Sequence, residues 1–161
     1  MNPNIFNTVS FAGNRMEKLN IFNDWQFFLI EDIVRFLIKY DYTSFLIGGC
    51  NGIDLICGEI IIKLKHELNT YIDLTAVLPF KEQAKSWPDE WKARYYNVLQ
   101  QCDKTLYISD DYFRGCYHQR NRVLVNKCSL LVAIYSEFSG GTKYTVQYAK
   151  KQQKNIMRVK I

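Results

Sequence analysis

Two glycine-rich turns lie far apart in this sequence of 161 residues. The first spans Gly48 to Asp54 (GGCNGID) and follows the apolar run Phe45 to Ile47. The second spans Ser139 to Thr142 (SGGT) and follows the apolar run Leu130 to Tyr135. Glycine lets the backbone approach a ligand closely, and the first turn of a helix offers free N–H groups to an anion. The two turns therefore predict a site for a phosphorylated, nucleotide-like ligand.

The second turn has the features of a phosphate site. Gly140 and Gly141 expose backbone N–H groups, and the Thr142 hydroxyl can donate at the start of the helix that follows. A plain helix cap formed by Thr142 is the alternative. The first turn is neither a Walker A loop nor a G-x-G-x-x-G fingerprint, and its alternative is a tight turn in which Asp54 caps the next helix.

Arginines and carboxylates supply the remaining candidate chemistry. Arg120 and Arg122 lie at the start of an expected helix, where an arginine can bind phosphate through two parallel N–H donors, with a surface charge as the alternative for one of the two. Arg15 follows the first expected strand and is a further candidate for binding phosphate. Asp54 and Glu59 are the carboxylates that could act as a general acid or base, and for Glu59 a solvent-facing position is an equal alternative. His118 could touch a ligand, but no nucleophile is paired with it.

Strand-like and helix-like segments alternate along the whole chain. The expected strands are 8–12, 45–47, 74–78, 104–108, 130–135 and 156–161. The expected helices are 25–40, with Asp24 as its N-cap, 53–68, 88–101, 117–127 and 142–153. This order predicts one α/β domain over residues 1–161, Rossmann-like, with an open, mostly parallel sheet and helices on both faces.

Ligands in such folds bind beyond the carboxyl ends of the strands. Polar or glycine residues follow four of the expected strands and should converge there. These strand exits are 13–15, 48–54, 109–111 and 139–142.

Composition narrows the class of protein. The chain is 48% hydrophobic with a formal net charge of +5, which suits a packed core and an anionic ligand. No long basic run favours nucleic acid, which is therefore not an expected partner. The five cysteines show no C-x-x-C spacing, so no metal site is expected and reduced thiols in a cytoplasmic protein are expected instead. We see no signal peptide and no membrane span.

Taken together, the motifs resemble the YpsA-like branch of the SLOG (Smf/DprA–LOG) superfamily over about residues 8–161. The residues that carry the resemblance are Gly13-Asn14-Arg15, Gly48-Gly49-x-x-Gly52-x-Asp54 with Glu59, Leu78-Pro79-Phe80, Tyr117-x-x-Arg120-Asn121, and Ser139-Gly140-Gly141-Thr142 with Tyr148-Ala149-Lys150.

The resemblance implies a Rossmann-like domain that binds a nucleotide or a nucleotide-derived ligand, with Mg²⁺ arriving on the phosphate, and a homodimer. LOG-type phosphoribohydrolases carry a P-G-G-x-G-T-x-x-E turn whose glutamate assists cleavage of the N-glycosidic bond. Thr145 stands here where that glutamate would fall. The candidate ligand-binding residues are Gly13, Asn14, Arg15, Gly48, Gly49, Asn51, Gly52, Asp54, Glu59, Pro79, Phe80, Ser109, Arg120, Asn121, Ser139, Gly140, Gly141 and Thr142.

Three functions follow as hypotheses. The first is a binding module that senses or sequesters a nucleotide signal, for example a sponge of the kind phages use against host defence. The second is an N-glycosidase or phosphoribohydrolase that uses Asp54 or Glu59. The third is a regulatory protein-interaction module in cell division or stress. Binding ranks first because the glutamate that LOG-type hydrolysis needs is replaced by Thr145.

Overall fold

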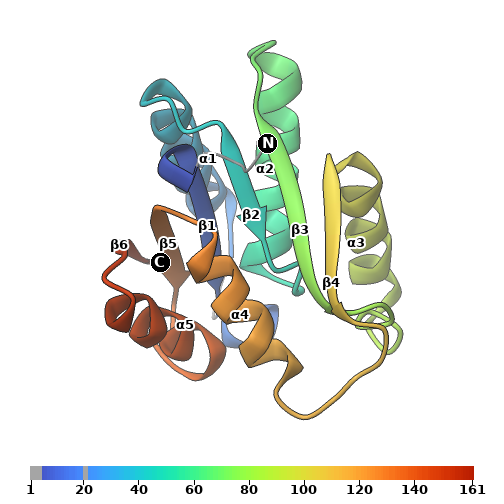
Figure 1. Cartoon of the computed structure of the whole chain (residues 1–161). Helices are drawn as coiled ribbons and strands as arrows, with labels where there is room; N and C mark the ends of the chain where they lie inside the picture. The colour runs from blue at the N-terminus through green and yellow to red at the C-terminus, as the bar shows by residue number, and fades with distance from the viewer. Residues whose placement is uncertain (1–4, 20–21) are drawn as a thin grey trace.

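A six-stranded parallel sheet forms the centre of the molecule in the computed structural model, which describes residues 5–19 and 22–161 (Figure 1). The spatial order of the strands is β4-β3-β2-β1-β5-β6, and every neighbouring pair is parallel. The strands are β1 (Thr8–Gly13), β2 (Ser44–Ile47), β3 (Asp73–Phe80), β4 (Lys104–Ser109), β5 (Leu130–Tyr135) and β6 (Asn155–Lys160). The predicted α/β, Rossmann-like class is confirmed, and the sheet is parallel throughout.

Helices cover both faces of this sheet. The helices are α1 (Asp24–Lys39), α2 (Ile53–Glu67), α3 (Asp89–Gln101), α4 (Cys116–Asn126) and α5 (Gly140–Lys151), with the short 3₁₀ turns η1 (Ile5–Asn7) and η2 (Met16–Lys18). Figure 1 shows α4 and α5 in front of the sheet and α1, α2 and α3 behind it. None of the helices in the described residues has the length and apolar character that a membrane span requires.

The core divides between the two faces because side chains alternate along a strand. Val9 and Phe11 of β1 point toward α1, α2 and α3 and belong to the larger apolar cluster. Ser10 and Ala12 point the other way, where the Ser10 hydroxyl donates to the Leu124 carbonyl oxygen of α4 at 2.7 Å. Small side chains on this second face let α4 and α5 lie close to β1, which brings the starts of both helices to the carboxyl end of that strand.

The helix starts differ from the sequence expectations in three places. Asn23, not Asp24, is the N-cap of α1, because its side chain accepts from the Trp25 N–H while the Gln26 side chain accepts from the Asn23 N–H. Gly52 is the N-cap of α2, so Asp54 lies inside that helix. Helix α5 begins at Gly140, so Thr142 lies in its first turn and is not its cap.

The strand order places a topological switch beside β1. Strand β1 lies between β2 and β5. From β2 the chain continues through β3 and β4 to one edge of the sheet, and from β5 it continues to β6 at the other edge. The loops that follow β1 and β5 therefore separate and leave a crevice at the carboxyl ends of the two strands. Open α/β sheets bind their ligands in such a crevice.

Candidate functional site

A cavity of about 350 Å³ lies at the carboxyl ends of β1 and β5. This volume falls at the small end of the range for ligand pockets. Four segments build its wall: the end of β1 with η2, the turn before α2, the start of α4, and the start of α5. The lining residues are Phe11, Ala12, Gly13, Asn14, Arg15, Glu17, Lys18, Cys50, Asp54, Tyr117, His118, Arg120, Asn121, Leu124, Ser139, Gly141, Thr142 and Thr145.

Asn14 fastens the two sides of the crevice together. Its buried side-chain oxygen accepts from the backbone N–H groups of Ser136 and Glu137, both at 2.9 Å. Its Nδ2 donates to the Glu137 carbonyl oxygen, also at 2.9 Å. These three bonds hold the loop after β5 against the end of β1 and so position the second glycine turn. The side chain of Asn14 is occupied by the protein itself.

Arg120 forms a buried hub on the cavity wall. Its Nε donates to Asn121 Oδ1 at 2.8 Å, its Nη1 donates to the Gly48 carbonyl oxygen, and its Nη2 lies 3.3 Å from Cys50 Sγ. Asp54 Oδ2 lies 3.8 Å from Nη1, and both side chains are almost fully buried. The guanidinium therefore ties α4 to the turn before α2.

The charges of this hub depend on one another. Burial opposes the charge of Arg120, but the Cys50 thiol and the Asp54 carboxylate raise the pKa of the guanidinium. Burial also opposes the charge of Asp54 and so raises the pKa of its carboxyl group. Arg120 and the Cys50 N–H, which donates to Asp54 Oδ2 at 3.2 Å, act in the other direction and lower this pKa. Removing either partner would leave a charge in a site with little water to solvate it.

The glycines of the first turn serve the packing of this hub. A Cβ at Gly48 would lie 2.0 Å from Arg120 Nη1. Gly52 has a φ of +122°, and a Cβ there would lie 2.5 Å from the Asn14 carbonyl oxygen, because Gly52 forms a β-bridge with Arg15. Neither glycine lines the cavity. The sequence predicted that these glycines let the backbone approach a ligand. In the structure they let the backbone approach Arg120 and the segment Asn14–Arg15 instead.

A second part of the cavity wall is basic and less buried than Arg120. The Arg15 guanidinium lies over the Tyr117 ring, 5.0 Å from its centroid, and the neighbouring Cys50 thiol is the largest of the influences that raise the Arg15 pKa. Lys18 Nζ donates to Ser139 Oγ at 2.9 Å, and Ser139 Oγ also contacts the Glu137 carboxylate. Two cations thus border the cavity from the segment just after β1.

The start of α5 lies beside these cations, and its first turn has no side-chain cap. Ser139 occupies the N-cap position, yet among the described residues no side chain caps the first turn of α5. Gly141 and Thr142 line the cavity there. Thr145 also lines it, but its hydroxyl donates to the Gly141 carbonyl oxygen at 2.7 Å. The helix start therefore presents backbone donors, and the Thr145 hydroxyl is engaged within the helix.

The structure brings half of the predicted residues to the cavity and leaves the others outside its lining. The predicted residues at the cavity are Gly13, Asn14, Arg15, Asp54, Arg120, Asn121, Ser139, Gly141 and Thr142. Those outside the lining are Gly48, Gly49, Asn51, Gly52, Glu59, Pro79, Phe80, Ser109 and Gly140.

Glu59 lies in a separate ion pair. Its carboxylate accepts from Arg94 Nε at 2.7 Å and Nη2 at 2.6 Å, and the Arg94 guanidinium lies over the Trp91 ring, 4.1 Å from its centroid. The pair joins α2 to α3.

Sequence reasoning missed Lys18 and Glu17, which line the cavity from η2. The sequence indicates their position only weakly, because they are simply two charged residues within five positions of the end of a strand. The same reasoning named Tyr117 only as part of a motif, although its ring forms part of the cavity wall. Among the described residues, no group of three or more His, Cys, Asp or Glu side chains could hold a metal ion. All five cysteines are free thiols.

Comparison with known proteins finds one matching family and several relatives. The model of the YspA SLOG family matches residues 9–161. A UPF0398 protein of Halalkalibacterium halodurans is 32% identical over 126 residues, which cover 76% of this chain and 66% of the relative. A UPF0398 protein of Oceanobacillus iheyensis is 29% identical over 155 residues, which cover 89% of this chain and 82% of the relative.

One solved structure with the same fold is DNA processing protein A from Helicobacter pylori, described for its single-stranded DNA binding mode. The TM-score is 0.67 over 94% of this chain, at 17% sequence identity, so the likeness concerns the fold. This chain spans 64% of that protein's length and 66% of the Halalkalibacterium relative's length.

Proposed function

Because this chain belongs to the YspA SLOG family, we propose that it binds a phosphorylated, nucleotide-derived small molecule in the cavity at the carboxyl ends of β1 and β5. In this proposal the protein senses or sequesters its ligand and leaves it intact. The phosphate lies at the start of α5, and the remainder of the nucleotide extends toward Tyr117 and His118.

One observation carries the proposal: two cations and an uncapped helix start border the same cavity. Arg15 and Lys18 approach from the segment after β1, and Gly141 and Thr142 approach from the first turn of α5. The helix dipole and the free N–H groups favour an anion at that end. A hydrogen bond between an arginine and a phosphate is charge-assisted and stronger than a neutral one.

The carboxylates of the cavity favour binding over turnover. Cleavage of an N-glycosidic bond needs a carboxylate that can reach the sugar, to stabilise positive charge or to activate water. Asp54 is held by Arg120 and by the Cys50 N–H, and Glu17 contacts the Asn51 amide at 3.4 Å. At position 145 a threonine bonds to its own helix. The lining thus offers no carboxylate that is both free and central.

Hydrolysis by Asp54 is the second candidate function. The observation that favours it is that Asp54 lines the cavity with a pKa raised by burial, as a general acid requires. This candidate predicts that a nucleotide incubated with the protein yields free base or ribose phosphate, and that Asp54→Asn abolishes the release.

The proposal is tested by identifying what the protein retains. The purified chain is denatured, the released molecules are identified by mass spectrometry, and thermal unfolding is followed with a panel of nucleotides. Gly141→Asp places a carboxylate at the phosphate position, and Gly141→Asn adds a neutral side chain of nearly the same size. A Cβ at this position lies 3.7 Å from Asn121 Nδ2, an ordinary contact, so both variants should fold.

We expect an intact nucleotide in the released fraction, or a thermal shift of several degrees that Gly141→Asp removes and Gly141→Asn largely keeps. Free base or ribose phosphate in the panel would show turnover and support the hydrolase instead. No retained molecule, together with no shift from any nucleotide in the panel, would contradict the proposed function.

A further inference from the structure

An aromatic ladder leads from the cavity wall to the solvent. It consists of three rings: Tyr117 in the first turn of α4, Phe80 at the end of β3, and Tyr112 in the loop between β4 and α4. The Phe80 ring meets Tyr117 edge to face at 6.0 Å between centroids, and it meets Tyr112 edge to face at 5.6 Å. Residues from three parts of the sequence therefore form one continuous aromatic surface.

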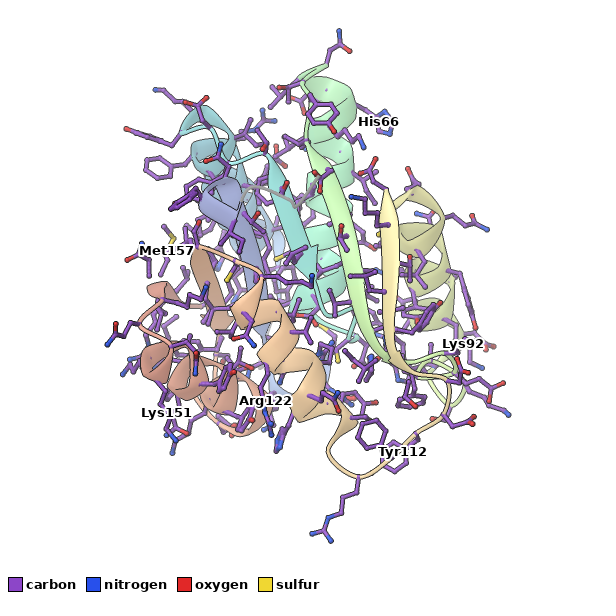
Figure 2. The ribbon with its side chains drawn as sticks, in the orientation of Figure 1. His66, Lys92, Tyr112, Arg122, Lys151 and Met157 are labelled. Atoms are coloured by element: carbon purple, nitrogen blue, oxygen red, sulfur yellow. The ribbon has the colours of Figure 1, made fainter. Side chains whose placement is uncertain are left out.

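The two ends of the ladder have different surroundings. Tyr117 lines the cavity and lies beneath the Arg15 guanidinium. Tyr112 is 64% exposed at the other end, and Phe113 beside it is 39% exposed. Figure 2 shows Tyr112 on the loop that leads into α4. Large apolar rings on a polar loop, joined to a ligand cavity, mark a surface that can take a partner with flat apolar faces.

The loop that carries Tyr112 is fastened to the end of β3. The Lys81 N–H donates to the Asp110 carbonyl oxygen at 3.3 Å, and Lys81 Nζ lies 2.6 Å from Asp110 Oδ1. The Cys116 N–H donates to the Phe113 carbonyl oxygen at 3.1 Å, where α4 begins. Both ends of the loop are thus anchored, and the ring of Tyr112 is presented from a defined position.

We propose that the ligand of this site carries two nucleobases joined through phosphate, and that the second base stacks on Tyr112. This inference rests on the proposed function. The cavity, at about 350 Å³, takes one nucleotide-sized group, and Tyr112 lies two ring contacts beyond its wall. Because the Tyr117–Phe80 and Phe80–Tyr112 centroids are 6.0 Å and 5.6 Å apart, we expect a single nucleotide in the cavity to stop short of Tyr112 and a dinucleotide with its phosphates near Arg15 to reach it.

The chemistry of the ladder favours a base over other apolar groups. Bases stack on exposed aromatic rings in a way that tolerates any base, and each stacked base contributes a measurable gain in affinity. Arg15 lies at the cavity end of the ladder and can neutralise the phosphate that joins the two nucleotides. The same pair of bases can belong to a small dinucleotide or to the end of a single strand.

The test compares mononucleotides with dinucleotides by calorimetric titration of the full chain. The probes are the four 5′-mononucleotides and the four matching 5′-phosphorylated dinucleotides. We expect at least one dinucleotide to bind roughly 5- to 150-fold more tightly than its mononucleotide, the gain of one stacked base. Tyr112→Ala should remove that gain and leave mononucleotide affinity unchanged, whereas Tyr112→Trp should keep it.

Tyr71→Ala is the matched control. Tyr71 is 83% exposed and precedes β3, so it lies at the opposite end of the sheet from Tyr112. This variant should bind every probe as the original chain does. If Tyr112→Ala weakens mononucleotides and dinucleotides equally, the ring has a structural role in the loop and the proposal of a second base is wrong.

Other outcomes separate this inference from the proposed function. Equal affinity for mononucleotides and dinucleotides in the original chain would overturn the second base and leave the proposed function standing. No binding of any nucleotide would overturn both. A single-stranded DNA of about ten nucleotides serves as a further probe. If its affinity exceeds that of the dinucleotides and is lost in Tyr112→Ala, the two bases belong to a single strand. If its affinity equals that of the dinucleotides, they belong to a small molecule.

Discussion

Two of the arginine–carboxylate pairs that involve helix α2 differ in almost every respect. Asp54 in its first turn faces Arg120 at 3.8 Å, and both side chains are less than 8% exposed. Glu59, five residues later, meets Arg94 through two short bonds, and these side chains are 26% and 31% exposed. The tighter contact is therefore on the surface, and the looser one is inside.

The difference shows how each arginine is used. Arg94 has one carboxylate and one indole ring as partners, and the pair simply joins α2 to α3. Arg120 divides its donors among a carbonyl oxygen, an amide oxygen and a thiol, so the Asp54 carboxylate balances its charge from a greater distance. The inner pair shapes the cavity wall, and the outer pair joins two helices outside the cavity lining.

The largest effect is expected at Arg120. Arg120→Ala leaves Asp54 buried without its counter-charge, and we expect the free energy of unfolding to fall by about 3–5 kcal/mol. Chemical denaturation measures this loss. Arg120→Met combined with Asp54→Leu removes both charges and should recover much of it. A single variant as stable as the original chain would show that the inner pair is not coupled as described.

Gly48→Ala breaks the same hub from the other side. The added Cβ would lie 2.0 Å from Arg120 Nη1, so the guanidinium must move, and we expect a loss of about 1–3 kcal/mol in denaturation. Gly141→Ala is the control, because its Cβ meets only an ordinary contact within a helix. That variant should be neutral or more stable by about 0.5–1 kcal/mol. Equal effects at the two glycines would contradict the packing role of Gly48.

Glu59→Gln tests the outer pair. It removes a partly exposed ion pair, so we expect a loss of about 1 kcal/mol or less in the free energy of unfolding. Nucleotide affinity should not change, because Glu59 lies outside the cavity lining. Calorimetric titration beside the denaturation curve checks both expectations. A large drop in nucleotide affinity would show that Glu59 takes part in binding, contrary to this account.

An effect of similar size to that of Glu59→Gln is expected where α2 meets α1. Hydrogen bonds from Lys63, and then from Arg35, lower the pKa of Glu31 below its ordinary value of 4.5. A lowered pKa contributes stability that is present above the ordinary value and is lost as the pH falls through the lowered one. Glu31→Gln should therefore cost about 0.5–1 kcal/mol at pH 7 and nothing at a pH below the lowered pKa. Denaturation at both pH values tests the sign.

The fold could be predicted from the sequence because its signals are local. Apolar runs such as Leu130–Tyr135 are buried strands, and four of the six expected strands are followed by a polar or glycine exit. Parallel order follows from the alternation of strands and helices, and the convergence of the exits follows from parallel order. Arg15 and Gly141 could be placed at one site by that logic alone.

The roles of single residues could not be predicted in the same way, because their partners are distant in the sequence. Glu59 pairs with Arg94, 35 positions away, and Arg120 fills the space beside Gly48, 72 positions away. Asn14 was expected to meet a ligand, yet its side chain holds the loop after β5. Glycine content alone does not distinguish close approach to a ligand from close approach to the protein's own arginine.

The central claim is that a phosphate binds between Arg15 and the start of α5. Its most direct test is calorimetric titration of a nucleotide and of the matching nucleoside, each with the original chain and with Arg15→Ala. We predict that the nucleotide binds at least roughly tenfold more tightly than the nucleoside, and that Arg15→Ala removes most of this difference while nucleoside affinity changes little. Equal affinities for nucleotide and nucleoside in the original chain, or a difference that Arg15→Ala leaves intact, would contradict it.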